Sequence, residues 1–278
     1  MKKLLILVSL FTALFATAQT QDTLYVWKAG VLVNIQSIKT ADMDSITFKR
    51  PVNPNGINIP GPNVTDIDGN VYASVTNCGQ TWTKQNLNVS KYSDGTPIPQ
   101  VTDPTAWANL TTGAWCYYAN NTANGPIYGK LYNWYAVAGI YDAASAANPA
   151  LRKKLAPTGW HVPTDGEWSN LINCLDVNAD GGNNPNTAGG KMKSTGTSLW
   201  ISPNTAATNE SGFTGLPAGC RIGDGSFATI GTNGIWWSSS ENLTTLAWFR
   251  SLYYNVGYAY RNYYYTKLYG FSVRCLRD

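Results

Sequence analysis

The 278-residue sequence predicts an α+β protein whose larger part combines two helices with short, irregular antiparallel strands. Two segments, near residues 130–139 and 164–175, carry apolar side chains at the spacing of a buried helix face. After residue 210, short runs of β-forming residues alternate with turns rich in Gly and Asn. Helices followed by a run of strands are typical of the α+β class.

Residues 1–18 have the three parts of a signal peptide. Lys2 and Lys3 give a positive start, residues 4–15 form an apolar run, and 16–18 (ATA) supply the small-x-small cleavage pattern. About a dozen apolar residues fall short of the ~20 that a membrane-spanning helix needs. We therefore expect export to the periplasm, the medium or the cell surface, with a mature chain that begins at Gln19 and has no membrane span.

The charge of the chain argues against nucleic-acid binding. Removal of Lys2 and Lys3 with the signal peptide lowers the net charge from +4 to +2. Charged residues make up 13% of the chain, about half of the ~25% that is typical of soluble domains. A nearly neutral protein lacks the basic surface on which phosphate binding depends.

A small unit and a linker precede the main domain. Within residues 19–49, three β-type runs at 24–27, 31–33 and 46–48 predict a leader of two or three strands. Residues 50–63 contain four prolines and are interpreted as a linker. The main domain is then residues 64–278.

The two expected helices have different signals. Residues 130–139 carry Leu131, Trp134, Tyr135 and Ala138 at helical spacing. In the second segment Thr164 is a good N-cap, and Glu167 three residues later completes a capping box. Apolar residues then repeat at helical spacing at positions 168, 171, 172 and 175.

Five cysteines remain in the mature chain, at positions 78, 116, 174, 220 and 275. An oxidising compartment permits up to two disulfides. Cys275 lies on the expected last strand and is our preferred bridging residue, with Cys220 as its candidate partner. The alternative is that most of the five are buried free thiols.

Seven blocks of sequence in order resemble the Fibrobacter succinogenes major paralogous domain family. They are 65–72 (TDIDGNVY) with 80–82 (QTW) and 86–88 (NLN), 129–134 (GKLYNW), 157–163 (PTGWHVP), 189–193 (GGKMK), 210–213 (ESGF), 236–241 (WWSSSE) and 270–275 (GFSVRC). The resemblance implies an exported bacterial protein, most often from Bacteroidetes or Fibrobacteres, with a fold related to C-type-lectin-like domains and formylglycine-generating enzymes. It implies no general activity. Some relatives are targets of diversity-generating retroelements.

Three residues were considered for catalysis, and each has a structural explanation. His161 has no nucleophile motif beside it, so we expect a structural imidazole in a turn. Glu167 is explained by its place in the capping box. Glu241 is expected to be a buried carboxylate that accepts backbone N–H bonds. No catalytic residue is therefore expected.

No cofactor is expected, with calcium as the alternative. Asp176, Asn178 and Asp180 with Gly181 copy the first half of an EF-hand loop. Position 12 of such a loop would be Thr187, which cannot supply the bidentate carboxylate. An Asn/Gly-rich loop without metal is the preferred interpretation. Nor do the tripeptides by which C-type lectins hold sugar through calcium occur in the chain.

The C-terminal segment predicts a binding surface. Residues 253–269 hold eight of the seventeen tyrosines. A core cannot satisfy eight buried phenols, so many must be exposed. Tyr and Asn supply rigid contact area and adaptable hydrogen bonds in antibody paratopes. The predicted ligand-binding residues are Tyr253, Tyr254, Asn255, Tyr258, Tyr260, Asn262, Tyr263, Tyr264, Tyr265 and Tyr269.

The charge pattern of this segment predicts a mildly cationic surface. No acid occurs from residue 242 to 277, whereas five cations do, at positions 250, 261, 267, 274 and 277. The expected partner is an extracellular glycan, neutral or anionic, or a protein. Because Tyr and Asn codons differ at the first base, adenine-directed mutagenesis would generate such a Tyr/Asn mixture. An aromatic surface fixed by descent is the alternative.

These observations favour an exported, non-catalytic ligand-binding protein with a surface that is hypervariable under the mutagenesis hypothesis. The alternatives are a secreted enzyme of the formylglycine-generating or glycan-active type, and a structural or adhesive surface component.

Overall fold

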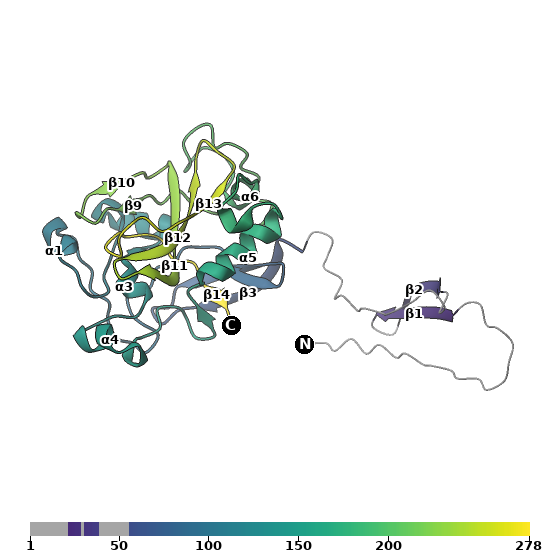
Figure 1. The fold of residues 1–278 in the computed structure, drawn as a ribbon, viewed down its shortest axis with the longest axis horizontal. Helices are drawn as coiled ribbons and strands as arrows, with labels where there is room; N and C mark the ends of the chain where they lie inside the picture. The colour runs from purple at the N-terminus through teal and green to yellow at the C-terminus, as the bar shows by residue number, and fades with distance from the viewer. Residues whose placement is uncertain (1–21, 29–30, 39–55) are drawn as a thin grey trace. The chain divides into compact units, whose positions relative to one another are not determined.

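The computed structural model describes residues 22–28, 31–38 and 56–278, and the chain divides into two compact units, 1–51 and 52–278 (Figure 1). In the first unit, β1 (Asp22–Lys28) and β2 (Val31–Ile38) pair antiparallel. They include the first two β-type runs of the leader. The third run, 46–48, the signal peptide and residues 50–55 of the expected linker lie outside the described residues.

The second unit contains a five-stranded sheet in the order β3-β4-β5-β14-β8, antiparallel throughout. Its strands are β3 (Ile59–Thr65), β4 (Val71–Asn77), β5 (Gln80–Thr83), β8 (Trp160–His161) and β14 (Leu276–Arg277). β3 begins within the segment interpreted as linker, because residues 59–65 pair with β4. The last strand, β14, lies between β5 and β8, which anchors the end of the chain inside the sheet.

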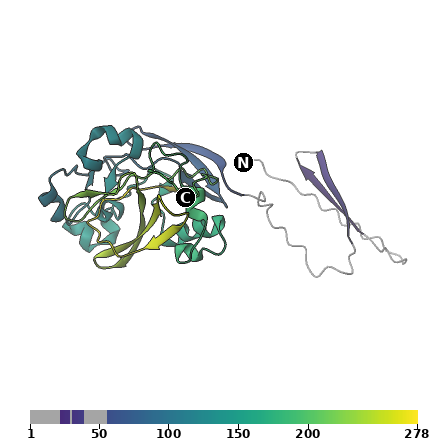
Figure 2. The same cartoon turned by 90° about the horizontal axis from the view of Figure 1, so that it is seen from above.

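A three-stranded antiparallel sheet in the order β11-β12-β13 carries the tyrosine-rich segment. Its strands are β11 (Asn233–Leu243), β12 (Leu246–Tyr253) and β13 (Ala259–Asn262). Figure 2 shows the yellow-green strands of this sheet along one side of the unit, beside the green helices. Two smaller antiparallel pairs complete the β structure: β6 (Trp115–Cys116) with β7 (Leu131–Tyr132), and β9 (Cys220–Arg221) with β10 (Phe227–Ala228).

Helix α5 (Asp165–Leu175) confirms the second predicted helix. Thr164 is its N-cap, and the capping box is complete: Glu167 N–H donates to Thr164 Oγ1 at 3.2 Å, and Thr164 N–H donates to Glu167 Oε2 at 2.7 Å. Trp168, Leu171, Ile172 and Leu175 are buried, as their spacing predicts. The helix therefore presents one apolar stripe to the core.

The first predicted helix, over 130–139, is wrong in most of its length. Residues 131–132 form β7, and α3 (Trp134–Val137) has a single turn. Asn133 begins this turn as its N-cap, with Oδ1 accepting from Ala136 N–H at 3.0 Å. Gly139, at φ 73°, ends it where a Cβ would lie 1.9 Å from the carbonyl oxygen of Lys153. The apolar spacing is real, but it serves a strand and a turn that are both buried.

Further short helices lie in the connections. They are α1 (Pro104–Ala108), α2 (Gly125–Tyr128), α4 (Ala143–Ala147), α6 (Ala188–Met192) and four 3₁₀ turns, η2 (Tyr118–Asn120), η3 (Thr122–Asn124), η4 (Pro149–Leu151) and η5 (Asp180–Gly182). Few long helices and several small antiparallel sheets confirm the α+β class. Among the described residues, none of the helices has both the length and the apolar character needed to cross a membrane.

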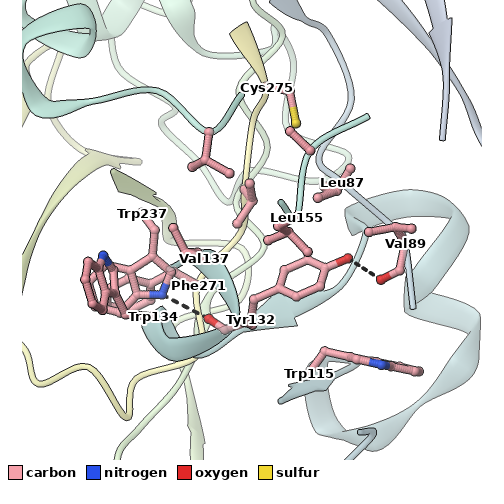
Figure 3. Close-up of a cluster of buried hydrophobic side chains, with 14 of the residues drawn as sticks. Leu87, Val89, Trp115, Tyr132, Trp134, Val137, Leu155, Trp237, Phe271 and Cys275 are labelled. Atoms are coloured by element: carbon pink, nitrogen blue, oxygen red, sulfur yellow. Dashed lines mark hydrogen bonds between the residues drawn. The ribbon is translucent and has the colours of Figure 1, made fainter. Parts of the chain in front are cut away.

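The interior has two main hydrophobic clusters. Figure 3 shows the first, in which Tyr132 occupies the middle: its hydroxyl donates to the Val89 carbonyl at 2.6 Å, and its carbonyl accepts from Trp237 Nε1 at 2.9 Å. The second cluster stacks Trp82, Trp168, Phe213 and Trp236 under α5. The buried hydroxyl and carbonyl of Tyr132 thus both have hydrogen-bond partners, which avoids the free-energy cost of burying an unpaired polar group.

Buried cations take the place of regular structure in the loops. Arg274 is fully buried, and its guanidinium donates to the carbonyls of Thr83, Phe213 and Thr214 and to Asn86 Oδ1, at 2.7–3.0 Å. Carbonyl groups in loops lack the hydrogen-bond partners that a β-sheet provides, so a guanidinium group with five donors can satisfy several of them at once.

The expected disulfide is wrong. Cys78, in the tight turn between β4 and β5, is bonded to Cys174 of α5. Cys220 and Cys275 are free, and both are buried, as is Cys116. The turn and the helix are 96 residues apart in sequence, so their proximity depends on the tertiary fold. The alternative of mostly free buried thiols describes three of the five cysteines.

Candidate ligand-binding surface

The tyrosines of residues 253–269 point to two faces of the β11–β13 sheet. Successive residues of a strand face opposite sides. On one side, Arg261 lies 3.6 Å above the ring of Trp248, and Tyr263 packs on the same ring with centroids 4.8 Å apart. On the other side, Tyr260 packs against Tyr253 at 5.2 Å.

Six tyrosines form a row of two sets of three on this second side, which we call the tyrosine ladder. The ring centroids lie 5.9 Å apart for Tyr258–Tyr260, 5.2 Å for Tyr260–Tyr253, 4.6 Å for Tyr264–Tyr265 and 4.3 Å for Tyr265–Tyr269. Burial raises the pKa of Tyr264 well above its usual value, and the nearby Tyr253 hydroxyl adds to this, so the two sets are neighbours. The ladder residues are Tyr253, Tyr258, Tyr260, Tyr264, Tyr265 and Tyr269.

The ladder has exposed and supporting members. Tyr264 is 54% exposed and Tyr258 37% exposed. Tyr265 is half-buried and stacks on Phe249 of the first core, with centroids 5.2 Å apart and planes at 20°. Tyr264 is therefore backed by rings that pack on the core, and Tyr258 packs on Tyr260, which limits the freedom of both exposed rings before any ligand binds.

The four other predicted ligand-binding residues do not share one location. Asn262 lies beside the ladder and donates from Nδ2 to Ser251 Oγ at 3.0 Å, and Asn255 is exposed in the loop between β12 and β13. Tyr254 packs against the second core, and Tyr263 faces the other side of the sheet. The structure thus brings six of the eight tyrosines together.

The expected cationic character of this surface is wrong. Arg250 is 1% exposed, and its Nη1 donates to Asp165 Oδ1 at 2.7 Å. Arg261 donates to both oxygens of the same carboxylate, at 2.7–3.1 Å. Arg274 is buried as described above. Asp165, the acid that pairs with Arg250 and Arg261, lies far away in the sequence, so the segment alone could not reveal it.

Lys267 and Glu241 form a second such pair. The Lys267 ammonium is nearly buried, donates to Glu241 and to the Thr244 carbonyl, and lies 4.6 Å from the ring centroid of Trp134. Glu241 was expected to be a buried acceptor of backbone N–H groups, which is wrong: its side chain is 49% exposed and its partner is this lysine. The pair holds the β11–β12 turn against the segment between Tyr265 and Tyr269.

Three residues that the sequence analysis did not single out hold the ladder in place. Lys193 Nζ donates to the carbonyls of Thr205, Tyr253 and Val256, at 2.7–3.0 Å. Asn186 clamps β13 through both backbone groups of Ala259: Nδ2 donates to its carbonyl at 3.0 Å, and Oδ1 accepts from its N–H at 3.0 Å. At Ala259, therefore, both backbone groups of the edge strand β13 have a hydrogen-bond partner.

Gly189 is the third supporting residue. A Cβ at this position would lie 2.1 Å from the Tyr258 carbonyl oxygen, so only glycine allows α6 to approach the loop. The neighbouring Gly190 N–H donates to the Gly257 carbonyl at 2.8 Å. The GGKMK block was the available signal, since paired glycines followed by a lysine indicate close backbone approach.

The calcium candidates use their oxygens within their own loop. Asp176 accepts from Thr187 N–H at 2.7 Å, Thr187 Oγ1 at 2.9 Å and Asn178 N–H at 3.1 Å, while Asp180 accepts from the Asn183 amide. Within the described residues, no group of three His, Cys, Asp or Glu side chains is placed to hold a metal. Thr187, the position that fails the EF-hand pattern, is instead the donor that closes this loop.

His161 lies away from the ladder, between two carboxylates. Its Nε2 is 3.0 Å from Glu167 Oε1, and its Nδ1 is 2.6 Å from Asp278 Oδ1. Burial raises the pKa of Glu167, but hydrogen bonds from Thr164 and the neighbouring His161 outweigh it, so the pKa of this carboxyl is lowered. His161 and Ser239 line a pocket of 240 Å³. With both nitrogens engaged, the ring has no free atom to accept a proton from a nucleophile.

A family model for the Fibrobacter succinogenes major domain matches residues 75–277. The chain belongs to this family. The match covers the whole ladder and all the residues that support it. No curated protein and no solved structure matches the chain.

Several sequence blocks of the Fibrobacter succinogenes major domain meet in the second core. Asn86 Oδ1 of the NLN block accepts from Trp236 Nε1 at 2.8 Å and from Arg274 Nε at 2.7 Å. Arg274 in turn binds the Phe213 carbonyl of the ESGF block at 2.9 Å. These blocks hold the framework of the domain together, whereas the ladder lies at its surface.

Proposed function

We propose that this Fibrobacter succinogenes major domain is an exported, non-catalytic module that binds a glycan or protein ligand through the tyrosine ladder. The observation that carries the proposal is the row of six rings, which is exposed at Tyr258 and Tyr264 and in which Tyr264 and Tyr265 pack on Phe249. Aromatic side chains that are rigid before binding give contact area at a low entropic cost.

Export is supported by the N-terminal sequence and by the disulfide. Residues 1–18 have the parts of a signal peptide, and Cys78 and Cys174 are bonded in the structure. Structural disulfides form and persist in oxidising compartments. Cell fractionation and N-terminal sequencing test this part, with Gln19 as the expected first residue. A chain that is retained in the cytoplasm with Met1 intact would contradict it.

The absence of catalysis is supported by the surroundings of His161. Two carboxylates, those of Glu167 and Asp278, lie within hydrogen-bond distance of its two ring nitrogens. This arrangement fits a structural residue that links β8, α5 and the C-terminal residue better than it fits a general base. A formylglycine-generating or glycan-active enzyme is the alternative function, and an adhesive surface component without a discrete ligand is the other.

The fold relationship and the diversification hypothesis are also proposals. A C-type-lectin-like fold is supported by the family resemblance, by the small irregular sheets and by the return of β14 to the sheet that begins with β3. Diversification is supported by the Tyr and Asn residues at exposed positions 255, 258, 263 and 264. A near-repeat of the coding segment beside a reverse-transcriptase gene, differing at adenines, tests it.

An array of extracellular glycans and proteins tests the binding function. The wild-type chain is compared with a variant that carries Tyr258→Ala, Tyr260→Ala and Tyr264→Ala, after circular dichroism shows that both are folded. We expect discrete ligands for the wild type and their loss in the variant. Equal binding by both chains would move the site away from the ladder.

A further inference from the structure

We infer that the ligand of the tyrosine ladder is an uncharged glycan; this rests on the proposed binding function and narrows its ligand class. The first observation is the withdrawal of charge from the surface. The guanidinium groups of Arg250 and Arg261 are directed to Asp165 on the opposite side of the sheet, and the Lys267 ammonium is held by Glu241. One carboxylate serves both arginines, so a net positive charge remains there, but it lies on the face of the sheet away from the ladder and is out of reach of an anionic ligand on the ladder.

The charges close to the ladder phenols also argue against an acidic ligand. Burial raises the pKa of Tyr260, Tyr265 and Tyr269, and neighbouring phenols raise it further. The one charged side chain that contributes at Tyr269 is Asp224, an acid at the end of the row. A carboxylate repels sulfated or uronic polymers, so the electrostatics oppose an acidic glycan.

The shape and chemistry of the ladder favour a sugar chain over a protein. The rings lie in two neighbouring sets, with Asn262 beside them and Asn255 exposed in the adjoining loop between β12 and β13, so ring faces and amides can meet successive units of an extended ligand. The negative face of an aromatic ring attracts the C–H groups of a sugar. Protein-binding hot spots combine aromatic residues with arginine, and here the arginines of the segment are turned away from the row.

Two rings are expected to make the main contacts. Tyr264 and Tyr258 are the most exposed members of the ladder, at 54% and 37%. Tyr263, in the same segment, is 47% exposed but lies on the other face with Trp248. It is therefore a matched control, with similar exposure and residue type but outside the row.

The test uses the 278-residue chain and immobilised polysaccharides. The uncharged probes are soluble starch, mixed-linkage β-glucan, galactan and mannan, and the acidic probes are alginate and heparin. We expect binding to at least one uncharged probe, unchanged between about 0.05 and 0.5 M NaCl because no ion pair is made. Tyr258→Ala and Tyr264→Ala should each weaken it by about tenfold, and Tyr263→Ala by less than about twofold.

Other results would overturn the inference in distinguishable ways. If the chain binds only acidic probes, and salt weakens this binding while Tyr264→Ala abolishes it, the ligand is not an uncharged glycan although the ladder is still the binding site. A ligand found only among the proteins on the array, with the same dependence on Tyr264, would lead to the same conclusion. Binding to starch or another uncharged probe that survives Tyr258→Ala and Tyr264→Ala together would overturn the ladder as the site. Urea denaturation of each variant confirms that lost binding does not reflect unfolding.

Discussion

Lys193 Nζ lies 3.0 Å from the carbonyl oxygen of Tyr253, the first residue of the tyrosine ladder in sequence order. The same ammonium binds the carbonyls of Val256 and Thr205, so one buried cation ties the loop between β12 and β13 to the segment that follows α6. Burial lowers the pKa of this lysine to about 8, which shows how much of its hydration is lost. Its three carbonyl partners offset that loss.

Replacement of this lysine should loosen the ladder. Lys193→Met leaves three carbonyls without their donor, and we expect the free energy of unfolding at neutral pH to fall by about 3 kcal/mol. Urea denaturation measures the change, and hydrogen exchange should accelerate at residues 253–259. Lys154→Met, at an exposed position, is the matched control and should change stability by less than about 0.5 kcal/mol. Equal effects of the two variants would contradict the role of Lys193.

Asp165 is expected to be the most sensitive carboxylate behind the sheet. Asp165→Asn leaves Arg250 buried without its counter-charge, which should cost about 3–5 kcal/mol at neutral pH. Asp180→Asn removes a charge from an exposed loop where Asn tolerates the positive φ of 46°, and serves as the control. A loss below about 1 kcal/mol for Asp165→Asn would mean that Arg250 finds another partner.

The same carboxylate predicts a pH dependence. Burial raises the pKa of Asp165, but its bonds to Arg261 and Arg250 outweigh this and hold the pKa below the usual value of 3.8. Its contribution to stability is therefore complete above the unfolded pKa of about 4 and is lost as the pH falls through the lower folded pKa. Urea midpoints should fall below pH ~4 more steeply for the wild type than for Asp165→Asn. Parallel curves would show that other carboxylates dominate.

The Cys78–Cys174 disulfide predicts a simple pattern of thiol chemistry. Peptide mapping should find this bridge alone, with Cys116, Cys220 and Cys275 reacting only after unfolding, because burial raises the pKa of each thiol. Reduction should lower stability by about 2–5 kcal/mol, since the closed loop is long. A Cys220–Cys275 bridge, or rapid labelling of Cys275 in the native protein, would contradict the fold around β14.

Gly189→Ala should displace Tyr258 from the ladder. The added Cβ would lie 2.1 Å from the Tyr258 carbonyl oxygen, so the loop must move. We expect weaker ligand binding together with a stability loss of about 1–3 kcal/mol, the cost of overpacking. Gly166→Ala, where a Cβ meets nothing within 4 Å, is the control. Unchanged binding by Gly189→Ala would show that the position of Tyr258 does not matter.

Local signals in the sequence predicted the elements that are determined locally. The capping box at Thr164 and Glu167 defined α5, and the composition of residues 253–269 indicated an exposed aromatic surface. The helix over 130–139 was wrong because a buried strand followed by one turn has nearly the same apolar spacing. Periodicity alone does not separate these cases over so short a span.

The pairing of the segment's arginines with an acid and the disulfide partners could not be predicted from the sequence, because both depend on contacts between residues that are far apart in the chain. Asp165 pairs with Arg250 and Arg261 across 85 and 96 residues, and Cys78 meets Cys174 across 96. The split of the tyrosines between two faces depends on the register of β12 with β13, which places Arg250 opposite Arg261. A shift of one residue would exchange the faces, so the ladder could not be listed before the register was known.

The most direct test of the ladder is ¹⁹F NMR with 3-fluorotyrosine, with resonances assigned by single Tyr→Phe substitutions at Tyr258, Tyr263 and Tyr264. The polysaccharide that binds best among the uncharged probes is titrated into the labelled chain. We predict that the resonances of Tyr258 and Tyr264 shift and saturate together, while that of Tyr263 stays in place. A shift at Tyr263 with Tyr258 and Tyr264 unchanged would contradict the ladder as the binding surface.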